Sequence, residues 1–286
     1  MAPHAPVLER GRAITVSELK DKARWLRLEV LRLIEQAGLG HYSSTMSCVE
    51  ILLALYYHAL RLCPTDPNWP DRDRFLLGKG HVAVGLWPIL ADLGYFPTQW
   101  LDEYGSARAA LTDHPNMRWV PGVDFSSGSL GHNLSVGVGM SLAGRLKGQD
   151  YRVFVLLGDG EVQEGQVWEA AMAAGHYHLG NLVAIVDANR YSGGGATNDA
   201  MTIEPLPERF RAFGWQAEEV DGHDFAALIA ALDALPPPSS DRPVCLVART
   251  AKGHGVAMME ATPQRWHLGL LPPELRETVR EEIARS

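Results

Sequence analysis

The stretch from Val153 to Ser192 reads VFVLLGDGEVQEGQVWEAAMAAGHYHLGNLVAIVDANRYS and decides the fold. It opens with a continuous apolar run, VFVLL, which is typical of a strand buried on both faces of a parallel sheet. Gly-Asp-Gly ends that run, a helix is expected over residues 164–177, and residues 182–186 form a second buried strand. This order predicts a βαβ crossover, and hence an α/β fold whose parallel central sheet carries helices on both faces.

Polar residues follow both strands of this crossover. Asp159 comes directly after the first strand and Asn189 after the second, so both should lie at the carboxyl ends of a parallel sheet, where such sheets bind ligands. An oxygen ligand from each loop can hold Mg²⁺ if a diphosphate supplies further oxygens. Gly158 and Gly160 let phosphate approach the backbone, and the helix that follows adds a favourable dipole. Taken alone, however, Gly-Asp-Gly is more often an ordinary strand-end turn.

The composition describes a soluble globular protein. The chain has 286 residues, of which 46% are hydrophobic and 21% charged, and its net charge is −8. This negative charge argues against nucleic acid or an anionic membrane as a partner. Cys48, Cys63 and Cys245 are scattered and lack metal-ligand spacing, which favours a reducing cytoplasm without disulfides. No apolar run suggests a signal peptide or a membrane span.

The simplest domain organisation is one domain over residues 1–286, because no linker or repeat interrupts the pattern. Residues 1–15 are expected to form an extended N-terminal arm. An amphipathic helix is predicted over residues 16–36, since apolar residues recur there at helical spacing before a glycine-rich stop. A second helix is predicted over residues 47–62, with His41 in the loop between the two helices.

The central stretch resembles the thiamine diphosphate (ThDP) motif, in which Asn follows Gly-Asp-Gly by thirty residues. Two segments of it resemble the sequences of transketolases in particular, namely EVQEGQVWEAA and GNLVAIVDANR. The resemblance implies the ThDP-binding fold, with this chain as the diphosphate-binding domain. It also implies that Asp159, Asn189 and the main-chain carbonyl of Tyr191 bind Mg²⁺, while Gly158 and Gly160 lie against the diphosphate.

Further motifs follow in the family's order over about residues 20–270. GHYSSTMS resembles the family's GHxGxxLS, GKGH its S-K-G-H loop, TDHP its Gly-His-Pro, SSGSLGHNL its TTGSLGQGL, AKGHGV its KGKGV and RWH its W-H-G. The resemblance implies catalytic roles in proton transfer and oxyanion stabilisation for His41, His114 and His267. It implies cofactor contacts for a larger set, namely Lys79, His81, Gly128, Ser129, Leu130, Lys252 and again His267.

Several positions depart from the family pattern near the expected site. The departures are Tyr42 to Ser44, Asp113 in place of glycine, His132 and Asn133 in place of Gln-Gly, the glycines 193–195, and Leu268 in place of glycine. The three glycines suggest a mobile loop. His254 replaces a lysine and is left without a role.

The resemblance covers only one domain of a transketolase. Family members also need a pyrimidine-binding domain that carries a catalytic glutamate, so we expect a second polypeptide, a C-terminal subunit, to supply it. Glu164 and Glu169 match a pair that forms a proton relay at the dimer interface. The expected assembly is a heterotetramer with two copies of each chain.

The expected activity is transfer of a two-carbon ketol unit from a ketose to an aldose, with sugars or sugar phosphates as substrates. Two alternatives remain open. One is a related ThDP enzyme that passes the two-carbon unit to a specialised acceptor in secondary metabolism. The other is a non-catalytic subunit that retains the fold and binds ThDP.

Overall fold

A computed structural model describes residues 7–285, so part of the expected arm over 1–15 lies outside the described residues. The strands are β1 (Arg74–Leu77), β2 (Val153–Gly158), β3 (Leu182–Ala188), β4 (Gln216–Asp221) and β5 (Val244–Arg249). The helices are α1 (Val16–Ala37), α2 (Tyr42–Met46), α3 (Val49–Ala54), α4 (Ala83–Asp92), α5 (His132–Leu146), α6 (Gly165–His176), α7 (Thr197–Ala200), α8 (Leu206–Ala212), α9 (Phe225–Asp233), α10 (Ala257–Ala261) and α11 (Pro273–Arg285). Four further helical segments are described: the π-helix η1 (Leu55–Ala59) and the 3₁₀ helices η2 (Gly80–Val82), η3 (Thr98–Glu103) and η4 (Glu161–Gln163).

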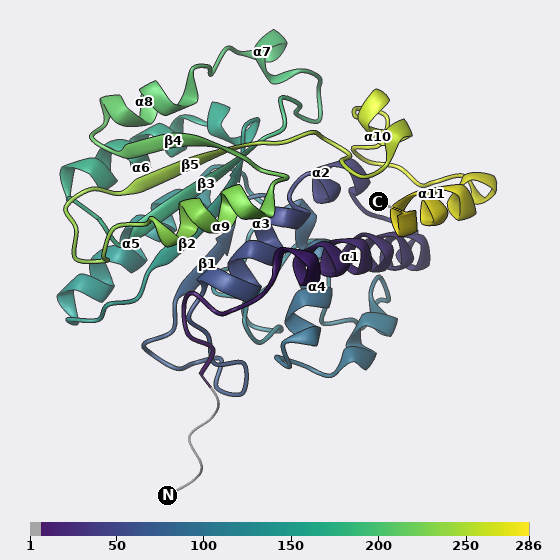
Figure 1. The fold of residues 1–286 in the computed structure, drawn as a ribbon, viewed down its shortest axis with the longest axis horizontal. Coiled ribbons are helices and arrows are strands. Elements are labelled where there is room, and N and C mark those ends of the chain that lie inside the picture. The colour runs from purple at the N-terminus through teal and green to yellow at the C-terminus, as the bar shows by residue number, and fades with distance from the viewer. Residues whose placement is uncertain (1–6, 286) are drawn as a thin grey trace, which may run out of the picture.

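The five strands form one parallel sheet in the order β1-β2-β3-β5-β4. In its register Val153 lies beside Leu182 and Gly158 beside Asp187, so the ends of β2 and β3 meet at one edge. Helix α6 connects these two strands, which confirms the predicted βαβ crossover (Figure 1). The loops that carry Asp159 and Asn189 therefore leave the same edge of the sheet.

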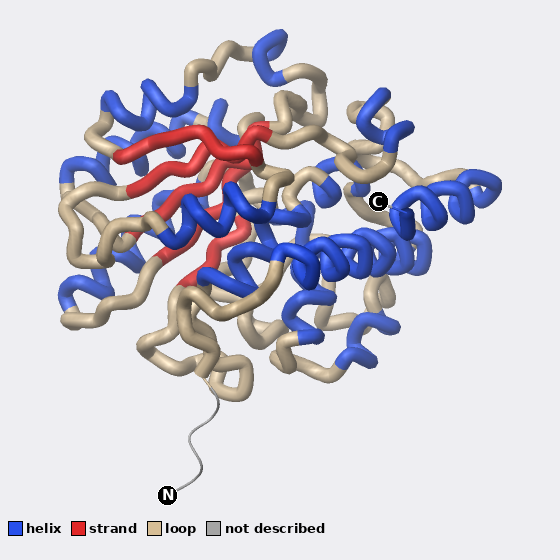
Figure 2. Tube along the Cα trace, viewed as in Figure 1, coloured by secondary structure: helices blue, strands red, loops and turns tan. Residues whose placement is uncertain are grey.

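Helices cover both faces of the sheet, as the uninterrupted apolar strands require (Figure 2). Alternate residues of each strand belong to two different core clusters. Phe154 and Leu156 of β2 face the cluster built with α1, α3, α4 and α9. Val153 and Val155 face the cluster built with α5, α6 and α8. Because the strands are packed on both faces, their ends are held in place, and so are the starts of the loops that follow them.

The N-terminal helices agree with the sequence in part. Helix α1 begins at a capping box formed by Thr15 and Glu18 and ends at Gly38, close to the predicted bounds. The predicted continuous helix over 47–62 is wrong, because α3 gives way to the π-helix η1. The Arg12 guanidinium donates hydrogen bonds to the carbonyls of Tyr57 and Leu60, which satisfies the groups freed where the helix ends.

A short helix also stands where a loop was expected. His41 lies at the N-cap position of α2, whose five residues are all buried. This buried turn carries His41 and Ser44 toward the sheet edge, so the predicted loop position of His41 is corrected to a helix start.

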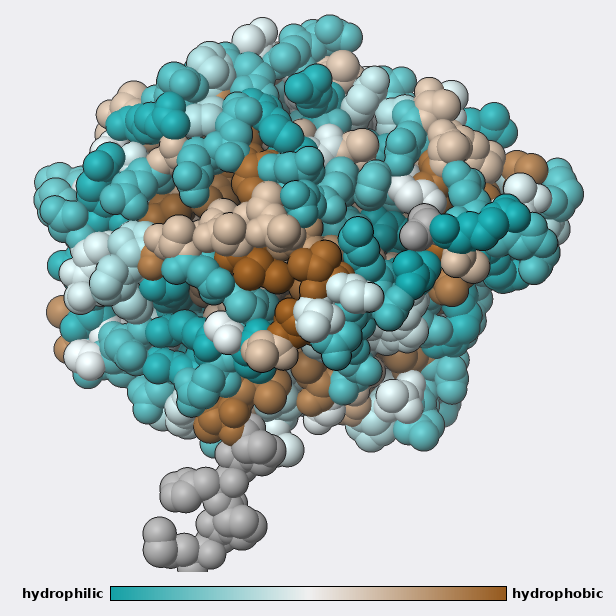
Figure 3. All heavy atoms as spheres, viewed as in Figure 1, coloured by the Kyte–Doolittle hydropathy of each residue, from teal (hydrophilic) through white to brown (hydrophobic). Residues whose placement is uncertain are grey.

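Hydrophobic side chains gather over α9 on the face shown in Figure 3, where Ala227, Ile229 and Ala231 are only partly buried.

Within residues 7–285, no helix combines the length and apolar character needed to cross a membrane.

Candidate active site

A cavity of about 320 Å³ opens at the carboxyl ends of β1, β2 and β3. Most of the residues predicted for the site line it. They are His41, Lys79, His81, Gly128, Leu130, Gly158, Asp159, Gly160, Asn189, Tyr191, Lys252 and His267. Ser44, Glu161, Ser192 and Gly193 line it as well, although no role was predicted for them. Residues distributed over more than 200 positions of the chain thus converge on one cavity.

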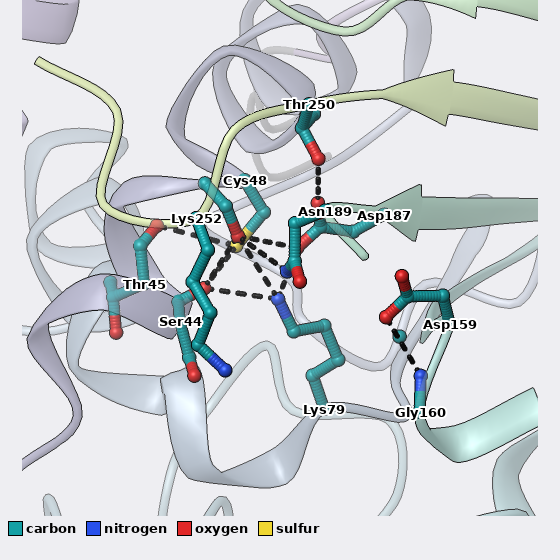
Figure 4. A network of polar contacts seen from close by, with 12 residues as sticks. Ser44, Thr45, Cys48, Lys79, Asp159, Gly160, Asp187, Asn189, Thr250 and Lys252 are labelled. Carbon is teal, nitrogen blue, oxygen red and sulfur yellow. Dashed lines mark hydrogen bonds and ion pairs between the residues drawn. The ribbon is translucent and has the colours of Figure 1, made fainter. Parts of the chain in front are cut away.

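The predicted metal ligands lie together on one side of this cavity. Oδ1 of Asp159 accepts a hydrogen bond from the amide of Gly160 at 2.8 Å (Figure 4). Oδ1 of Asn189 accepts one from the Tyr191 amide at 3.0 Å, and the Tyr191 carbonyl accepts one from Lys252 Nζ at 3.3 Å. Carboxylate, amide and carbonyl oxygens are hard donors of the kind that Mg²⁺ takes.

The electrostatics of Asp159 suit a cation. Burial, and then the nearby Asp187 carboxylate, raise the pKa of Asp159 to about 7. A raised carboxyl pKa means that the surroundings compensate the negative charge poorly. A divalent cation at this position would supply the missing compensation. The residues present therefore fit a bound Mg²⁺ together with a diphosphate.

Beneath the cavity lies a buried ionic network that was not predicted from the sequence (Figure 4). Lys79 forms an ion pair with Asp187 of β3, and Nζ of Lys79 also donates to the Ser44 carbonyl at 3.0 Å. Ser47 donates to Asp187 at 2.6 Å, and Thr250 also donates to this carboxylate. Although burial opposes it, Lys79 and these hydroxyls lower the pKa of Asp187, and Asp187 raises the pKa of Lys79. Both groups are therefore charged at neutral pH.

This network also orients Asn189. The Asn189 amide nitrogen donates to Ser47 Oγ and to Asp187 Oδ2, each at 3.1 Å. Because both amide hydrogens point into the network, the side-chain oxygen is turned toward the other proposed metal ligands. Asp187 could have been found from the sequence, since an acidic residue inside a fully buried strand, LVAIVDA, requires a partner.

Three histidines that line the cavity lie close together. The ring centroids of His41 and His81 lie 4.9 Å apart, those of His41 and His267 5.3 Å, and those of His81 and His267 5.7 Å. Burial and then the Lys252 charge lower the pKa of His267 to about 4. Burial and the neighbouring cations also depress the pKa of His81. His81 and His267 are therefore neutral at pH 7 and can each donate and accept hydrogen bonds.

The glycines at 193–195 form a turn that backbone hydrogen bonds close. The Ser192 amide donates to the Gly195 carbonyl at 2.8 Å, and Tyr191 and Ala196 pair across the turn. A Cβ atom at Gly193 would lie 3.0 Å from Nε2 of His267. Glycine at this position therefore leaves room for the imidazole of His267 at the cavity wall.

Glu161 joins the two loops that flank the cavity. Its carboxylate accepts hydrogen bonds from the Gly131 amide at 3.0 Å and the Gly158 amide at 3.1 Å. Burial raises the pKa of this carboxyl to about 7. Gly131 has φ = +83°, and a Cβ there would meet Glu164 at 2.7 Å, so glycine is required at this junction. A charged residue after a turn is typical of an exposed helix start, so the sequence carries no signal for this burial.

Some predicted residues lie outside the cavity lining. The His114 side chain is 43% exposed at the rim, next to Asp113. Ser129, Glu164 and Glu169 are exposed on the surface. Leu130 does line the cavity but retains 37% of its accessible surface.

Residues that depart from the family pattern differ in how exposed they are. His132 is exposed, whereas Asn133 is fully buried with no hydrogen-bond partner for its amide among the described residues. Leu268 is 58% exposed.

A second cavity, of about 380 Å³, lies beside α1 and contains Glu50, His223 and His254, whose ligand atoms lie within 4.8 Å of one another. Both nitrogens of His223 are already engaged, because Nδ1 lies 3.0 Å from Glu50 and Nε2 accepts from the Ala251 amide at 2.8 Å. Glu50 also pairs with Arg27 at 2.6 Å. The cluster thus ties α1, α3 and the ends of β4 and β5 together. His254 stacks on His223 at 3.6 Å, and burial lowers its pKa.

The comparisons with known proteins point to one family. Residues 19–278 match the family model described as "Transketolase, thiamine diphosphate binding domain". An apulose-4-phosphate transketolase subunit from Phocaeicola vulgatus is 38% identical over 269 residues, which cover 94% of this chain and 95% of the relative. A 6-deoxy-6-sulfo-D-fructose transketolase subunit from Clostridium sp. is 37% identical over 85% of this chain and 88% of the relative.

The solved structures agree with the sequence comparisons. The crystal structure of transketolase from Campylobacter jejuni superimposes with a TM-score of 0.88 at 27% identity. That match covers 95% of this chain but only 43% of the Campylobacter protein. The chain therefore spans less than half the length of that full-length transketolase, whereas it spans nearly all of the two relatives from Phocaeicola and Clostridium.

Proposed function

This chain belongs to the transketolase family, and we propose that it is the diphosphate-binding subunit of a two-component transketolase. The reaction is the ThDP-dependent transfer of a two-carbon ketol unit from a ketose to an aldose, with sugars or sugar phosphates as substrates. The observation that carries the proposal is the convergence of Asp159, Asn189 and the Tyr191 carbonyl with Lys79, Lys252 and three histidines on one cavity. The whole of residues 1–286 forms one domain in this proposal.

The cavity offers oxygen ligands to the positive Mg²⁺ ion and N–H donors to the negative diphosphate. Asp159, Asn189 and the Tyr191 carbonyl would hold the metal. Lys252 and His81 would donate to diphosphate oxygens, with Gly158 and Gly160 allowing close approach. Lys79 is held back by its ion pair with Asp187 and contributes positive potential from below. When bound, ThDP supplies the carbanion chemistry that cleaves a ketose between C2 and C3.

The histidines suit the proton movements of such a reaction. His267 is neutral, and its Nδ1 is held by Ser44 Oγ at 3.0 Å and Lys252 Nζ at 3.1 Å. Nε2 of His267 is the nitrogen beside Gly193, at the cavity wall. We propose that His41, His114 and His267 stabilise developing oxyanions and move protons at substrate hydroxyl groups. His41 and His267 do so from the cavity lining and His114 from its rim.

The exposed half of the site supports the presence of a partner chain. Gly128, Ser129 and Leu130, which should contact the aminopyrimidine end of ThDP, are exposed in this chain. We propose that a C-terminal subunit covers them and supplies the pyrimidine-binding domain and the catalytic glutamate. Two copies of each chain would assemble as a heterotetramer in the cytoplasm. Glu164 and Glu169, which are exposed near this face, would then form the proton relay at its dyad.

The relatives from Phocaeicola and Clostridium are named for unusual sugars, apulose 4-phosphate and 6-deoxy-6-sulfo-D-fructose, which keeps a specialised substrate within the proposal. The donor and acceptor pair is therefore to be found by a substrate panel. A non-catalytic role is disfavoured, because the proposed metal ligands and all three catalytic histidines are present.

The proposal is tested by ketose cleavage with purified chains freed of host transketolase, at saturating ThDP and Mg²⁺. We expect no turnover from this chain alone and robust turnover when the C-terminal subunit is added. Full turnover by this chain alone would contradict the two-component proposal. ThDP binding without turnover on any ketose in the panel, with the partner present, would favour the non-catalytic alternative.

A further inference from the structure

We propose that Asp113 is a positioning residue that orients His41 and His114 toward the substrate. The inference rests on the proposed function of the two histidines and extends it to a residue at which this sequence departs from the family's glycine. The Asp113 carboxylate lies between the two imidazole rings. Its Oδ1 is 3.7 Å from Nδ1 of His41, and its Oδ2 is 3.4 Å from Nδ1 of His114.

The pair of Asp113 and His41 is desolvated. The side chains of His41 and Asp113 are only 13% and 19% exposed. Nδ1 of His41 and Oδ1 of Asp113 are both buried, and neither has a hydrogen-bond partner within residues 7–285. Leaving a buried polar atom without a hydrogen bond is unfavourable. Since these two atoms face each other, closing the gap by about 1 Å would satisfy both with one hydrogen bond.

The carboxylate also selects a tautomer of each ring. An N–H group directed at a carboxylate is favoured, whereas a nitrogen lone pair directed at it is repelled. Asp113 thus favours the tautomer of His41 and of His114 that carries its proton on Nδ1, which leaves Nε2 of each ring as an acceptor. A carboxylate that fixes the tautomer and orientation of a histidine is a recurrent device in catalytic and metal sites.

The loop that carries Asp113 is anchored by other contacts. Trp87 Nε1 donates to the Thr112 carbonyl at 3.0 Å, and Thr112 Oγ1 donates to the His114 carbonyl at 2.6 Å. Neither bond involves the Asp113 side chain. Replacing that side chain should therefore leave the loop in place, and the effects of the charge can be measured separately.

The kinetic test uses the two-component enzyme with ThDP and Mg²⁺. Asp113→Asn keeps the shape without the charge, Asp113→Gly restores the family residue, and Asp113→Glu returns the carboxylate. The control is Glu103→Gln, which neutralises an exposed carboxylate elsewhere on the surface. We expect Asn and Gly to lower kcat by about 10- to 100-fold, with the ThDP dissociation constant and Tm unchanged and part of the rate restored by Glu. Wild-type kcat in the glycine variant, or a parallel loss of ThDP affinity and Tm, would overturn the inference.

A second measurement does not depend on activity. Long-range ¹H–¹⁵N correlation spectra of the full chain labelled with ¹⁵N-histidine report which ring nitrogen carries the proton. We expect the Nδ1–H tautomer for His41 and His114 in the wild type and its loss in Asp113→Asn. Tautomers that are the same in both proteins would refute the positioning role. If the wild-type complex transferred no ketol unit, the proposed function would fail while the tautomer result still decided the inference.

Discussion

The Lys79 ammonium group and the Asp187 carboxylate form an ion pair in which the two side chains are only 4% and 0% exposed. Lys79 follows β1 and Asp187 lies near the end of β3. Since β2 lies between these two strands, the ion pair spans the end of β2, which Asp159 follows directly. Removing two charges from water is expensive, and the pair is maintained by the additional hydrogen bonds from Ser47 and Thr250. The floor of the cavity is therefore fixed by electrostatics as well as by packing.

Replacing Asp187 by asparagine should destabilise the chain strongly. The change leaves the Lys79 charge buried without its partner, a defect that typically costs about 3–5 kcal/mol. Because the pKa of Asp187 is lowered in the folded state, its stabilisation is present above the ordinary pKa of an aspartate, about 4, and is lost as the pH falls through the lower folded value. Urea unfolding at pH 7 and at pH 3 measures both effects.

The matched control for this change is Asp199→Asn, which removes an exposed carboxylate from α7. It should alter the unfolding free energy by less than about 0.5 kcal/mol. A loss in Asp187→Asn no larger than in this control would show that the buried pair contributes nothing to stability.

Mg²⁺-dependent ThDP binding should weaken as the pH falls below about 7, the pKa to which burial raises Asp159. A metal must displace the proton from a protonated ligand, so the apparent Mg²⁺ affinity should fall by about tenfold per pH unit well below that value. Asp159→Asn should bind too weakly to show the effect. Calorimetric titrations between pH 5.5 and 8 measure it.

Glu161→Gln separates the two carboxyls whose pKa values lie near 7. A pH slope that persists in this variant belongs to Asp159 or to the cofactor, and the ionisation of the free cofactor is measured separately and subtracted. Unchanged Mg²⁺ affinity between pH 8 and pH 5.5 in the wild type would contradict the assignment of Asp159 as a ligand.

Glu161→Gln should itself loosen the cavity. The glutamine amide can accept from only one of the Gly131 and Gly158 amides and turns its own donors toward the other. One buried N–H is then unsatisfied, at a cost of about 1–3 kcal/mol in unfolding free energy. ThDP affinity should fall as well, since both loops border the cavity. Denaturation and ThDP titration measure both losses, and Glu218→Gln, which neutralises an exposed carboxylate on β4, is the control. Values in Glu161→Gln equal to those of this control would contradict the bridging role of Glu161.

His114→Ala should act on turnover rather than on cofactor binding. His114 stands at the rim, outside the cavity lining, and its proposed partner is the two-carbon fragment. Losing a positioned acid–base group typically lowers the rate by about 10²- to 10⁴-fold. The measurement compares kcat of the two-component enzyme with the ThDP dissociation constant. A variant as active as the wild type would remove His114 from the mechanism.

Much of the fold and site could be predicted because the signals are local. An apolar run, a glycine turn and a second apolar run define a crossover, and a crossover places Asp159 and Asn189 at one edge. The resemblance to a family then named residues from distant segments, and twelve of the predicted residues line a single cavity. Periodicity alone could not have brought His41 beside His267, since they are separated by more than 200 positions.

The residues that were missed act through burial, which a sequence shows poorly. Asp187 is needed because β3 is buried on both faces, and Glu161 because its loop folds back under Gly131. The end of α3 was misplaced since a π-helix differs from an α-helix in its hydrogen bonds and not in its composition. The backbone hydrogen bond that closes the glycine turn at 193–195 could not be read from its glycine content.

Lys252 supplies the last prediction, because its Nζ lies in the cavity, 3.3 Å from the Tyr191 carbonyl and 3.1 Å from Nδ1 of His267. Burial and then the Lys79 charge lower the pKa of Lys252 to about 8. A bound diphosphate would favour the charged form and raise that pKa toward its ordinary value. At pH 8.5, where the free chain holds this proton only in part, ThDP binding should therefore be accompanied by proton uptake.

Calorimetry in buffers of different ionisation enthalpy measures this uptake. Lys252→Met should abolish it and weaken ThDP binding by about 10- to 100-fold, the loss expected for one charge-assisted hydrogen bond. Lys147→Met, on the surface beyond α5, is the matched control and should leave both quantities unchanged. In the free chain Nζ of Lys252 lies 3.3 Å from the Tyr191 carbonyl, so Mg²⁺ at that oxygen would repel it and turn it toward the diphosphate. Proton uptake that persists in Lys252→Met would place the responsible group elsewhere and leave Lys252 as a packing residue.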